Sequence, residues 1–169
     1  MRRVGDVFLA PNAVVTADVT LGRFVSLWYG VVVRGDVAPV TVGDGTNLQD
    51  GVIVHCDHGV PNDIEADVVV GHAAVLHGRR VGSGTLVGIG ARLLGGSEVG
   101  EECVIAAGAV VPPGVRVPPR SVVMGVPGKV VRAATADEVA KTRVIAERYR
   151  ELARLYADGE VAWPYGKPV

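Results

Sequence analysis

The chain has 169 residues and a formal net charge of −1, with 49% hydrophobic and 21% charged residues. This length favours one domain with its own core, and the balanced charge does not suggest a nucleic-acid surface. The sequence has no apolar run long enough to cross a membrane, and its first residues lack the apolar stretch of a signal peptide. Two cysteines are too few for a disulfide framework, so we expect a cytoplasmic protein.

Aliphatic residues recur at every sixth position along most of the chain. In the longest run, eight such positions follow one another: Val81, Val87, Leu93, Val99, Ile105, Val111, Val117 and Val123. Five more lie in residues 9–33, and runs of three begin at Val42 and Ile64. At three hexads to a coil, this repeat predicts about six coils.

A period of six is typical of a β-helix in which each hexad forms a short strand and a corner. Alternate strand residues point inward, and we expect the glycine that often follows the aliphatic residue to relieve backbone strain at the corner. Such hexapeptide repeats resemble the left-handed parallel β-helix. The predicted fold is therefore an all-β solenoid. A sandwich of separate strands is the alternative, but a sandwich does not hold a six-residue register over eight repeats.

The register breaks three times. Three residues are extra between Val33 and Val42, four are extra between Val54 and Ile64, and one is missing between Leu76 and Val81. Insertions in a solenoid become surface loops, often at the binding face. We therefore expect the functional site near residues 34–80.

The repeat ends in a stretch rich in proline and glycine, and a helix is predicted after it. Thr135 and Glu138 have the spacing of a capping box. Apolar residues then follow at helical spacing: Val139, Ile145, Tyr149, Leu152 and Tyr156. We expect a β-helix domain over 1–130, a helix over 131–157 packed on the solenoid or against a neighbouring subunit, and a tail over 158–169.

All four histidines, His55, His58, His72 and His77, fall within 23 residues. His55 and His77 each directly follow an inward aliphatic residue, and the 22 positions between them make one coil. The two imidazoles are therefore predicted to stack one rung, about 4.8 Å, apart. Solvated surface histidines are the alternative interpretation.

His72 lies one strand length, roughly 15 Å, from His77, so it cannot easily reach the same ion within one chain. If three prisms pack side by side, His72 of one copy can meet His55 and His77 of the next. Three imidazoles with an open fourth position describe a catalytic zinc site that generates a metal-bound hydroxide near neutral pH. His58, in the inserted loop, either lines this site, shuttles protons or is an ordinary exposed residue.

Several motifs in the same region resemble the gamma-class carbonic anhydrase family. They are the Arg-Gly-Asp of residues 34–36, the stretches 46–51, 54–59, 70–72 and 76–78, and Gly-Val-Pro-Gly-Lys at 125–129. The resemblance extends from about residue 8 to residue 156. It implies a homotrimer with metal at the subunit interfaces, held by His55, His72 and His77. The implied reaction is the reversible hydration of carbon dioxide to bicarbonate, with Zn²⁺ as the usual metal and Fe²⁺ or Co²⁺ as replacements.

The resemblance also assigns roles around the metal. Gln49 matches a residue that hydrogen-bonds metal-bound water or bicarbonate, and Asn47 matches a second polar contact. Arg34, Asp36 and Asp50 match a charge network across the interface, a role that suits the planar guanidinium of Arg34. A purely structural ion pair is the alternative for Arg34 and Asp36.

Tyr149 is similar to a helix tyrosine that reaches the active site in relatives, with packing against the solenoid as its alternative role. The chain departs from the best-studied type of the family at Val37, where that type has a glutamate. Its short loop has Asp57 and His58 in place of an acidic loop that carries a proposed proton shuttle. Slow proton transfer would leave the activity low.

Three other functions remain open at the level of sequence. A hexapeptide acyltransferase would use acetyl-CoA with a histidine as general base and no metal. A thioesterase would use the same metal site on acyl-CoA substrates. A catalytically weak scaffold would retain metal only for assembly.

Overall fold

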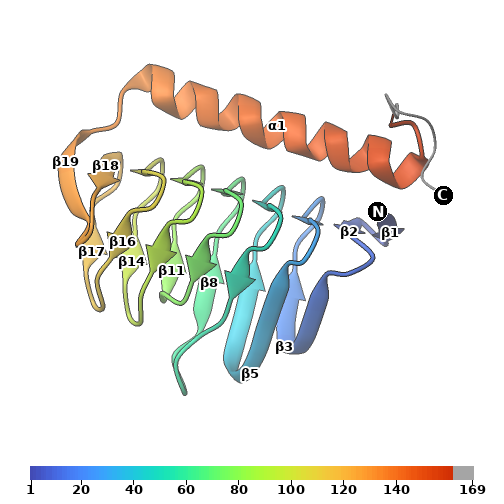
Figure 1. Ribbon diagram of the computed structural model, residues 1–169, viewed down its shortest axis with the longest axis horizontal. Helices are drawn as coiled ribbons and strands as arrows, with labels where there is room; N and C mark the ends of the chain where they lie inside the picture. Colours follow the sequence, from blue (N-terminus) through green and yellow to red (C-terminus); the bar gives the residue numbers. More distant parts are fainter. Residues whose placement is uncertain (162–169) are drawn as a thin grey trace.

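The computed structural model describes residues 1–161 and shows a three-sided prism of stacked coils with one helix along it (Figure 1). The fold is a left-handed parallel β-helix of about six turns. The six-residue period predicts the coils, and the resemblance to hexapeptide-repeat proteins implies their left hand. The expected tail includes residues 162–169, which lie outside the described residues. From Leu27 onward the inward aliphatic residues are buried and stack in register, as where Val54 pairs with Leu76. The first coil is looser than predicted, since Leu9 and Leu21 are half-buried and Val15 is 40% exposed.

The strands line up in three faces. The first face consists of β2 (Val7–Leu9), β4 (Ser26–Leu27), β6 (Asn47–Leu48), β9 (Val69–Val70), β12 (Leu86–Val87), β15 (Val104–Ile105) and β18 (Ser121–Met124). The second face consists of the first halves of β3 (Val14–Leu21) and β5 (Val32–Val42), with β7 (Ile53–Val54), β10 (Val75–Leu76), β13 (Arg92–Leu93) and β16 (Val110–Val111). The third face consists of the second halves of β3 and β5, with β8 (Asn62–Ile64), β11 (Arg80–Val81), β14 (Glu98–Val99) and β17 (Arg116–Val117). We call the corners that follow these faces the first, second and third corners.

Both ends of the first face are closed by antiparallel strands. β1 (Arg2–Val4) pairs with β2, and β19 (Lys129–Ala133) pairs with β18. The turn between β18 and β19 also bonds to the last strand of the second face. Val110 N donates to Gly125 O at 3.1 Å, and Gly128 N donates to Val110 O at 2.7 Å.

The outward side chains differ sharply between the second and third faces. The outward column of the second face is aliphatic except at one position: Val14, Val32, Ile53, Val75, Arg92 and Val110. The outward column of the third face is polar throughout: Thr20, Thr41, Asp63, Arg80, Glu98 and Arg116. The second face thus leaves aliphatic side chains in solvent, Val14 being 49% and Ile53 44% exposed.

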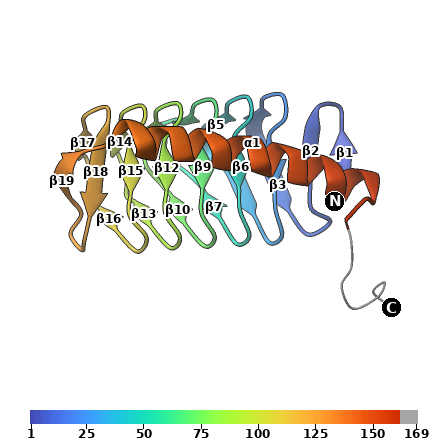
Figure 2. The same cartoon turned by 90° about the horizontal axis from the view of Figure 1, so that it is seen from above.

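The C-terminal helix α1 (Ala136–Asp158) runs back along the prism toward the N-terminus (Figure 2). It contacts β1, β2, β4, β6 and β9. The predicted capping box is confirmed, since Thr135 accepts from Glu138 N and Glu138 accepts from Thr135 N. Of the predicted apolar stripe only Val139 is buried. The other buried positions are small residues that a search for apolar periodicity misses: Thr142, Ala146 and Ala153. No helix in the described residues is long and apolar enough to span a membrane.

The glycines that follow the inward aliphatic residues are needed for a different reason from the one expected. The next rung passes too close for a side chain, and a Cβ on Gly100 would lie 2.5 Å from Pro119 N. The left-handed backbone occurs instead at later corner positions such as Gly51, whose φ is +72°. Close stacking of successive rungs therefore excludes a side chain at positions such as Gly100.

This close stacking makes Gly100→Ala destabilising. The added methyl must displace the backbone of Pro119, and such overpacking costs about 1–3 kcal/mol of unfolding free energy. Urea denaturation followed by circular dichroism measures the loss. The control is Glu101→Ala at the adjacent exposed position, which we expect to change stability by less than about 0.5 kcal/mol. Equal stability of Gly100→Ala and the wild type would contradict the steric explanation.

The capping box predicts a pH dependence. Hydrogen bonds from Arg132 and Thr135 lower the pKa of Glu138 from 4.5 to about 2. Its ionised form therefore stabilises the folded state fully above about pH 4.5, and this contribution is lost as the pH falls toward 2. We expect Glu138→Gln to lower the unfolding free energy at pH 7 and to approach the wild type near pH 2. A difference that is constant over this range, or equally present in the control Glu147→Gln, would contradict the prediction.

Candidate metal centre

Two of the four histidines meet at the second corner. His55 directly follows β7 and His77 directly follows β10, and the two strands are paired in register. His55 N donates to Leu76 O at 3.1 Å, which fixes the backbone of one histidine to the residue before the other. The predicted stacking of His55 and His77 on adjacent rungs is therefore observed.

The imidazole nitrogens face one another at the distance that a shared ion requires. His55 Nδ1 lies 3.3 Å from His77 Nε2. Two nitrogens bound to one tetrahedral Zn²⁺ at about 2.0–2.1 Å are separated by about 3.3–3.4 Å. The His55 side chain is only 18% exposed and that of His77 32%. The pair therefore fits two ligands of one metal ion.

Each of the three predicted ligands has an aspartate beside its other ring nitrogen. The pairs are His55 Nε2 with Asp36 Oδ1 at 2.9 Å, His72 Nδ1 with Asp50 Oδ2 at 3.0 Å, and His77 Nδ1 with Asp57 Oδ1 at 3.6 Å. Metal-binding histidines usually donate their second N–H to such a carboxylate, which fixes the tautomer and the ring orientation. The aspartates thus leave the opposite nitrogen of each ring available as a donor of electrons to a metal.

Arg34 and Asp36 form a charged group next to His55. Arg34 Nη1 donates to Asp36 Oδ2, and Arg34 Nη2 lies 3.4 Å from His55 Nδ1. The hydrogen bond with His55, together with that from Arg34, holds the pKa of Asp36 below its ordinary value. Asp36 therefore remains an anion that can orient His55.

His72 lies at a different corner from the other two ligands. It follows β9 at the first corner, and β10 separates it from His77. Asp50, which bonds to His72, is itself fixed because its Oδ1 accepts from Tyr29 N at 3.1 Å. Within residues 1–161 of one chain, no three His, Cys, Asp or Glu side chains gather as a metal-binding group.

Asn47 and Gln49 lie at the end of the first face, immediately before the corner that bears His72. Both side chains are buried, and Gln49 Nε2 donates to Asn47 Oδ1 at 3.3 Å. Asn47 Nδ2 is buried without a partner among the described residues. An unpaired buried donor is costly, and because this atom has almost no accessible surface, its side chain must turn before it can meet an acceptor at the corner.

Tyr149 packs against the same region from α1. Its ring lies edge-on to Trp28 with 5.4 Å between centroids, and Tyr156 contacts Trp28 in the same way at 5.3 Å. Burial, with a smaller effect from the charge of Asp50, raises the pKa of Tyr149 above its ordinary value. Tyr149 therefore stays neutral and reaches the neighbourhood of Asp50.

The inserted loop that carries His58 leaves this residue exposed beside the second corner. The loop is anchored at its tip, where Gly59 N donates to Val37 O at 3.1 Å, and at its base, where Val60 N donates to Asp57 O at 3.0 Å. Asp57 turns back toward His77. His58 follows His55 by three residues in the chain, and the structure shows no hydrogen bond or ion pair from its side chain to either His55 or His77.

One residue of this corner escapes the sequence analysis. Asn62 is the first residue of β8 and is 1% exposed. Its Nδ2 donates to His55 O at 2.8 Å and to Leu76 O at 3.0 Å. Asn62 lies where the repeat resumes after the four-residue insertion. This position is the one feature of the sequence that could have pointed to its role.

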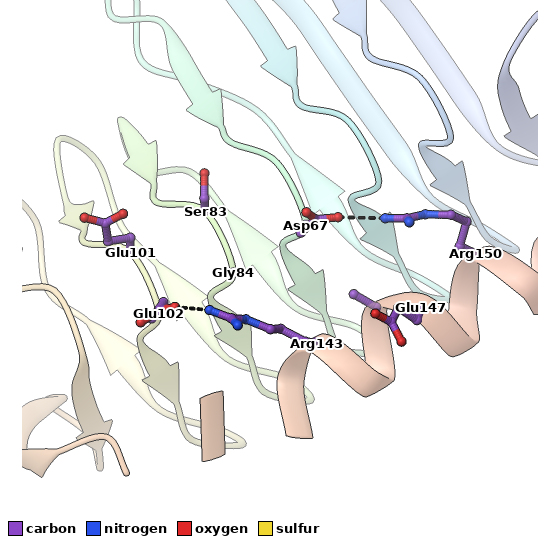
Figure 3. Close-up of a pocket in the computed structure, with 9 residues that line it drawn as sticks. Asp67, Ser83, Gly84, Glu101, Glu102, Arg143, Glu147 and Arg150 are labelled. Atoms are coloured by element: carbon purple, nitrogen blue, oxygen red, sulfur yellow. Dashed lines mark hydrogen bonds and ion pairs between the residues drawn. The ribbon is translucent and has the colours of Figure 1, made fainter. Parts of the chain in front are cut away.

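A cavity of about 380 Å³ lies elsewhere, between α1 and the third corner (Figure 3). Two ion pairs join its walls, Arg143 with Glu102 at 2.6 Å and Arg150 with Asp67 at 2.7 Å. No histidine lines it. Its arginines are paired with carboxylates and attach α1 to the solenoid.

Comparisons with known proteins identify the family of the chain. Residues 80–113 match the family model described as bacterial transferase hexapeptide (six repeats). The carbonic anhydrase of Geobacillus kaustophilus is 40% identical over 149 residues, which cover 88% of this chain and 82% of that protein. Gamma carbonic anhydrase 2, mitochondrial, of Arabidopsis thaliana is 41% identical over 158 residues, which cover 90% of this chain and 57% of that protein.

The chain spans 57% and 58% of the two Arabidopsis relatives that it matches. Among solved structures, a hexapeptide transferase family protein from Anaplasma phagocytophilum has a TM-score of 0.86 and 34% identity, covering 90% of each chain. The matches to these two carbonic anhydrases cover 90% and 88% of this chain. The chain belongs to the gamma-class carbonic anhydrase family of hexapeptide-repeat proteins.

Proposed function

We propose that this protein catalyses the reversible hydration of carbon dioxide to bicarbonate at a metal held by His55, His72 and His77. The observation that carries the proposal is the 3.3 Å separation of His55 Nδ1 and His77 Nε2, which suits two ligands of one tetrahedral ion. When bound, a Zn²⁺ ion supplies Lewis acidity that brings the pKa of coordinated water near neutrality, and Fe²⁺ or Co²⁺ can replace it.

The metal site is proposed to lie between the subunits of a homotrimer. His72 is at the far end of β10 from His77, so a second copy of the chain is needed to supply it. The aliphatic outward column of the second face supports such an interface, because exposed Val14 and Ile53 would be buried between subunits. The first corner of one subunit would then meet the second corner of the next, with Arg34, Asp36 and Asp50 at the contact.

Asn47 and Gln49 are proposed to orient the substrate. They end the first face next to His72, and once its side chain turns toward the corner, the unpartnered Nδ2 of Asn47 can donate to an oxygen of carbon dioxide or bicarbonate. Gln49 holds the Asn47 side chain by the bond between their amides. Tyr149 is proposed to keep Trp28 packed behind this corner rather than to transfer a proton, since burial favours its neutral form.

His58 is proposed to carry the proton to solvent. It is exposed on the loop beside the histidine pair, and an imidazole exchanges protons readily near neutral pH. Hydration releases one proton for each bicarbonate, so a group of this kind can limit the turnover.

Acyl transfer is a second candidate function, which the likeness to a hexapeptide transferase family protein favours. It requires acetyl-CoA and no metal. To separate the two functions, free thiol release from acetyl-CoA and carbon dioxide hydration are each measured with and without a chelator. Carbon dioxide hydration is expected to be lost with the metal, whereas acyl transfer would be unaffected.

Removal of any proposed ligand should abolish both metal binding and activity. His55→Ala, His72→Ala and His77→Ala are each expected to purify without stoichiometric metal and to lose more than about 100-fold in carbon dioxide hydration, a larger loss than a supporting residue causes. Elemental analysis and stopped-flow hydration measure these effects. His58→Ala is the control and should retain one metal per chain.

Mixing two inactive variants tests the shared interface directly. In a cyclic trimer refolded from equal amounts of His55→Ala and His72→Ala chains, a site is intact only where wild-type His55 meets wild-type His72, which occurs at about one site in four. Activity near a quarter of the wild type is therefore expected. No recovery in trimers shown to be mixed would exclude ligands from two subunits.

The proposed proton carrier is tested by the buffer. His58→Ala should lower kcat in weak buffer by up to about 100-fold, with kcat/KM unchanged, because the residue acts only after the substrate has reacted. Added imidazole should restore kcat. If turnover has the same buffer dependence in the variant and the wild type, His58 has no part in proton transfer.

A further inference from the structure

Asn62 occupies a special place at the second corner. It is the first residue of β8, directly after the inserted loop, and its side chain is buried. Its Nδ2 reaches two carbonyl groups on adjacent rungs, His55 O at 2.8 Å and Leu76 O at 3.0 Å. The first carbonyl belongs to one histidine and the second belongs to the residue before the other.

The regular ladder between these two rungs is interrupted at this point. His55 N donates to Leu76 O, and in the described part of the chain the next backbone bond between the two rungs runs from Asp63 N to Arg79 O. The interruption follows from the sequence. The rung of His55 carries four extra residues at this corner, and the rung of His77 lacks one. Without another link, the two histidines would stand at the open end of the ladder. The Asn62 amide supplies that link.

The orientation of the amide shows that its donors are used in preference to its acceptor. Both neighbouring backbone groups are carbonyls, so the two N–H bonds of Nδ2 are directed at them. Asn62 Oδ1 is buried and has no partner among the described residues. Leaving this oxygen unpaired is unfavourable, and the double donation offsets the cost.

We propose that Asn62 is a positioning residue that sets the separation of His55 and His77 and thereby the affinity of the metal centre. It acts through the backbone, because both of its acceptors are peptide groups that adjoin the ligands. This inference rests on the proposed metal site. It adds a residue from the third face to a centre whose other supports are the aspartates beside the rings.

The test compares Asn62→Ala, which removes both donors, with Asn62→Ser, whose single hydroxyl can reach only one carbonyl. The readouts are the Zn²⁺ dissociation constant by competition with a chromogenic chelator and the visible absorption spectrum of the Co²⁺-loaded trimer. Neither readout depends on turnover. We expect a 10–100-fold weaker affinity for Asn62→Ala, the range found when a residue supporting a metal ligand is removed. Asn62→Ser should lie between this variant and the wild type.

Thr85→Val is the matched control for a general loss of stability. Thr85 is fully buried at the third corner, where its Oγ1 donates to Gly100 O at 2.9 Å and accepts from Cys103 N at 3.1 Å. It therefore links adjacent rungs as Asn62 does, but at a corner without histidines. Thr85→Val should lower the melting temperature while leaving the Zn²⁺ affinity and the Co²⁺ spectrum unchanged.

The outcomes separate this assignment from the proposed function. Wild-type affinity in Asn62→Ala, or an equal loss in Thr85→Val, would overturn the positioning role and leave the metal site standing. If Asn62→Ala does not fold, the same comparison is made with Asn62→Ser. A wild-type protein that binds no Zn²⁺ would overturn the proposed function and the role of Asn62 with it.

Discussion

Backbone hydrogen bonds between successive coils are the interaction on which the rest of the molecule depends. They fix the register of each strand against the strand above it, so a residue on one rung determines what its neighbour one turn later can contact. The pairing of Val54 with Leu76 places the two following imidazoles side by side, although 22 positions separate them in the chain. The same stacking requires Gly100, because the next rung passes too close for a side chain.

The candidate site lies where this regularity fails. Between the regular columns of the second and third faces, one rung gains a loop and the next loses a residue. The backbone there is free to present side chains away from the core, but it also loses ladder bonds that would hold them. The side chain of Asn62 replaces the missing bonds by donating to two backbone carbonyls, and Asp36 holds the ring of His55. The candidate site and the side-chain bonds that replace the lost backbone bonds thus lie at the same corner.

The sequence predicts the solenoid, the stacked histidines and the capped helix because each depends on a short-range rule. An aliphatic residue at every sixth position has one consistent structural solution, and counting along it places His55 next to His77. The register cannot specify which aspartate turns toward which ring, since Asp36 lies in the irregular middle of β5, Asp50 at a corner and Asp57 in the inserted loop, and no period describes these positions. Asn62 was missed for the same reason, and the buried Ala146 and Ala153 of α1 were missed because small residues carry no strong apolar signal.

The antiparallel strands at the two ends have a consequence for the size of the particle. In an uncapped stack of parallel coils, the first and last coils expose unpaired backbone N–H and C=O groups. The last coil of one solenoid can then pair with the first coil of another, and the solenoids grow into a fibre. β1 and β19 run against this direction, and Gly125 and Gly128 occupy the bonding groups of Val110 at the final coil. A newly arriving coil would find no free edge of matching polarity on these strands, so β1 and β19 block lengthwise polymerisation at the two ends of the first face.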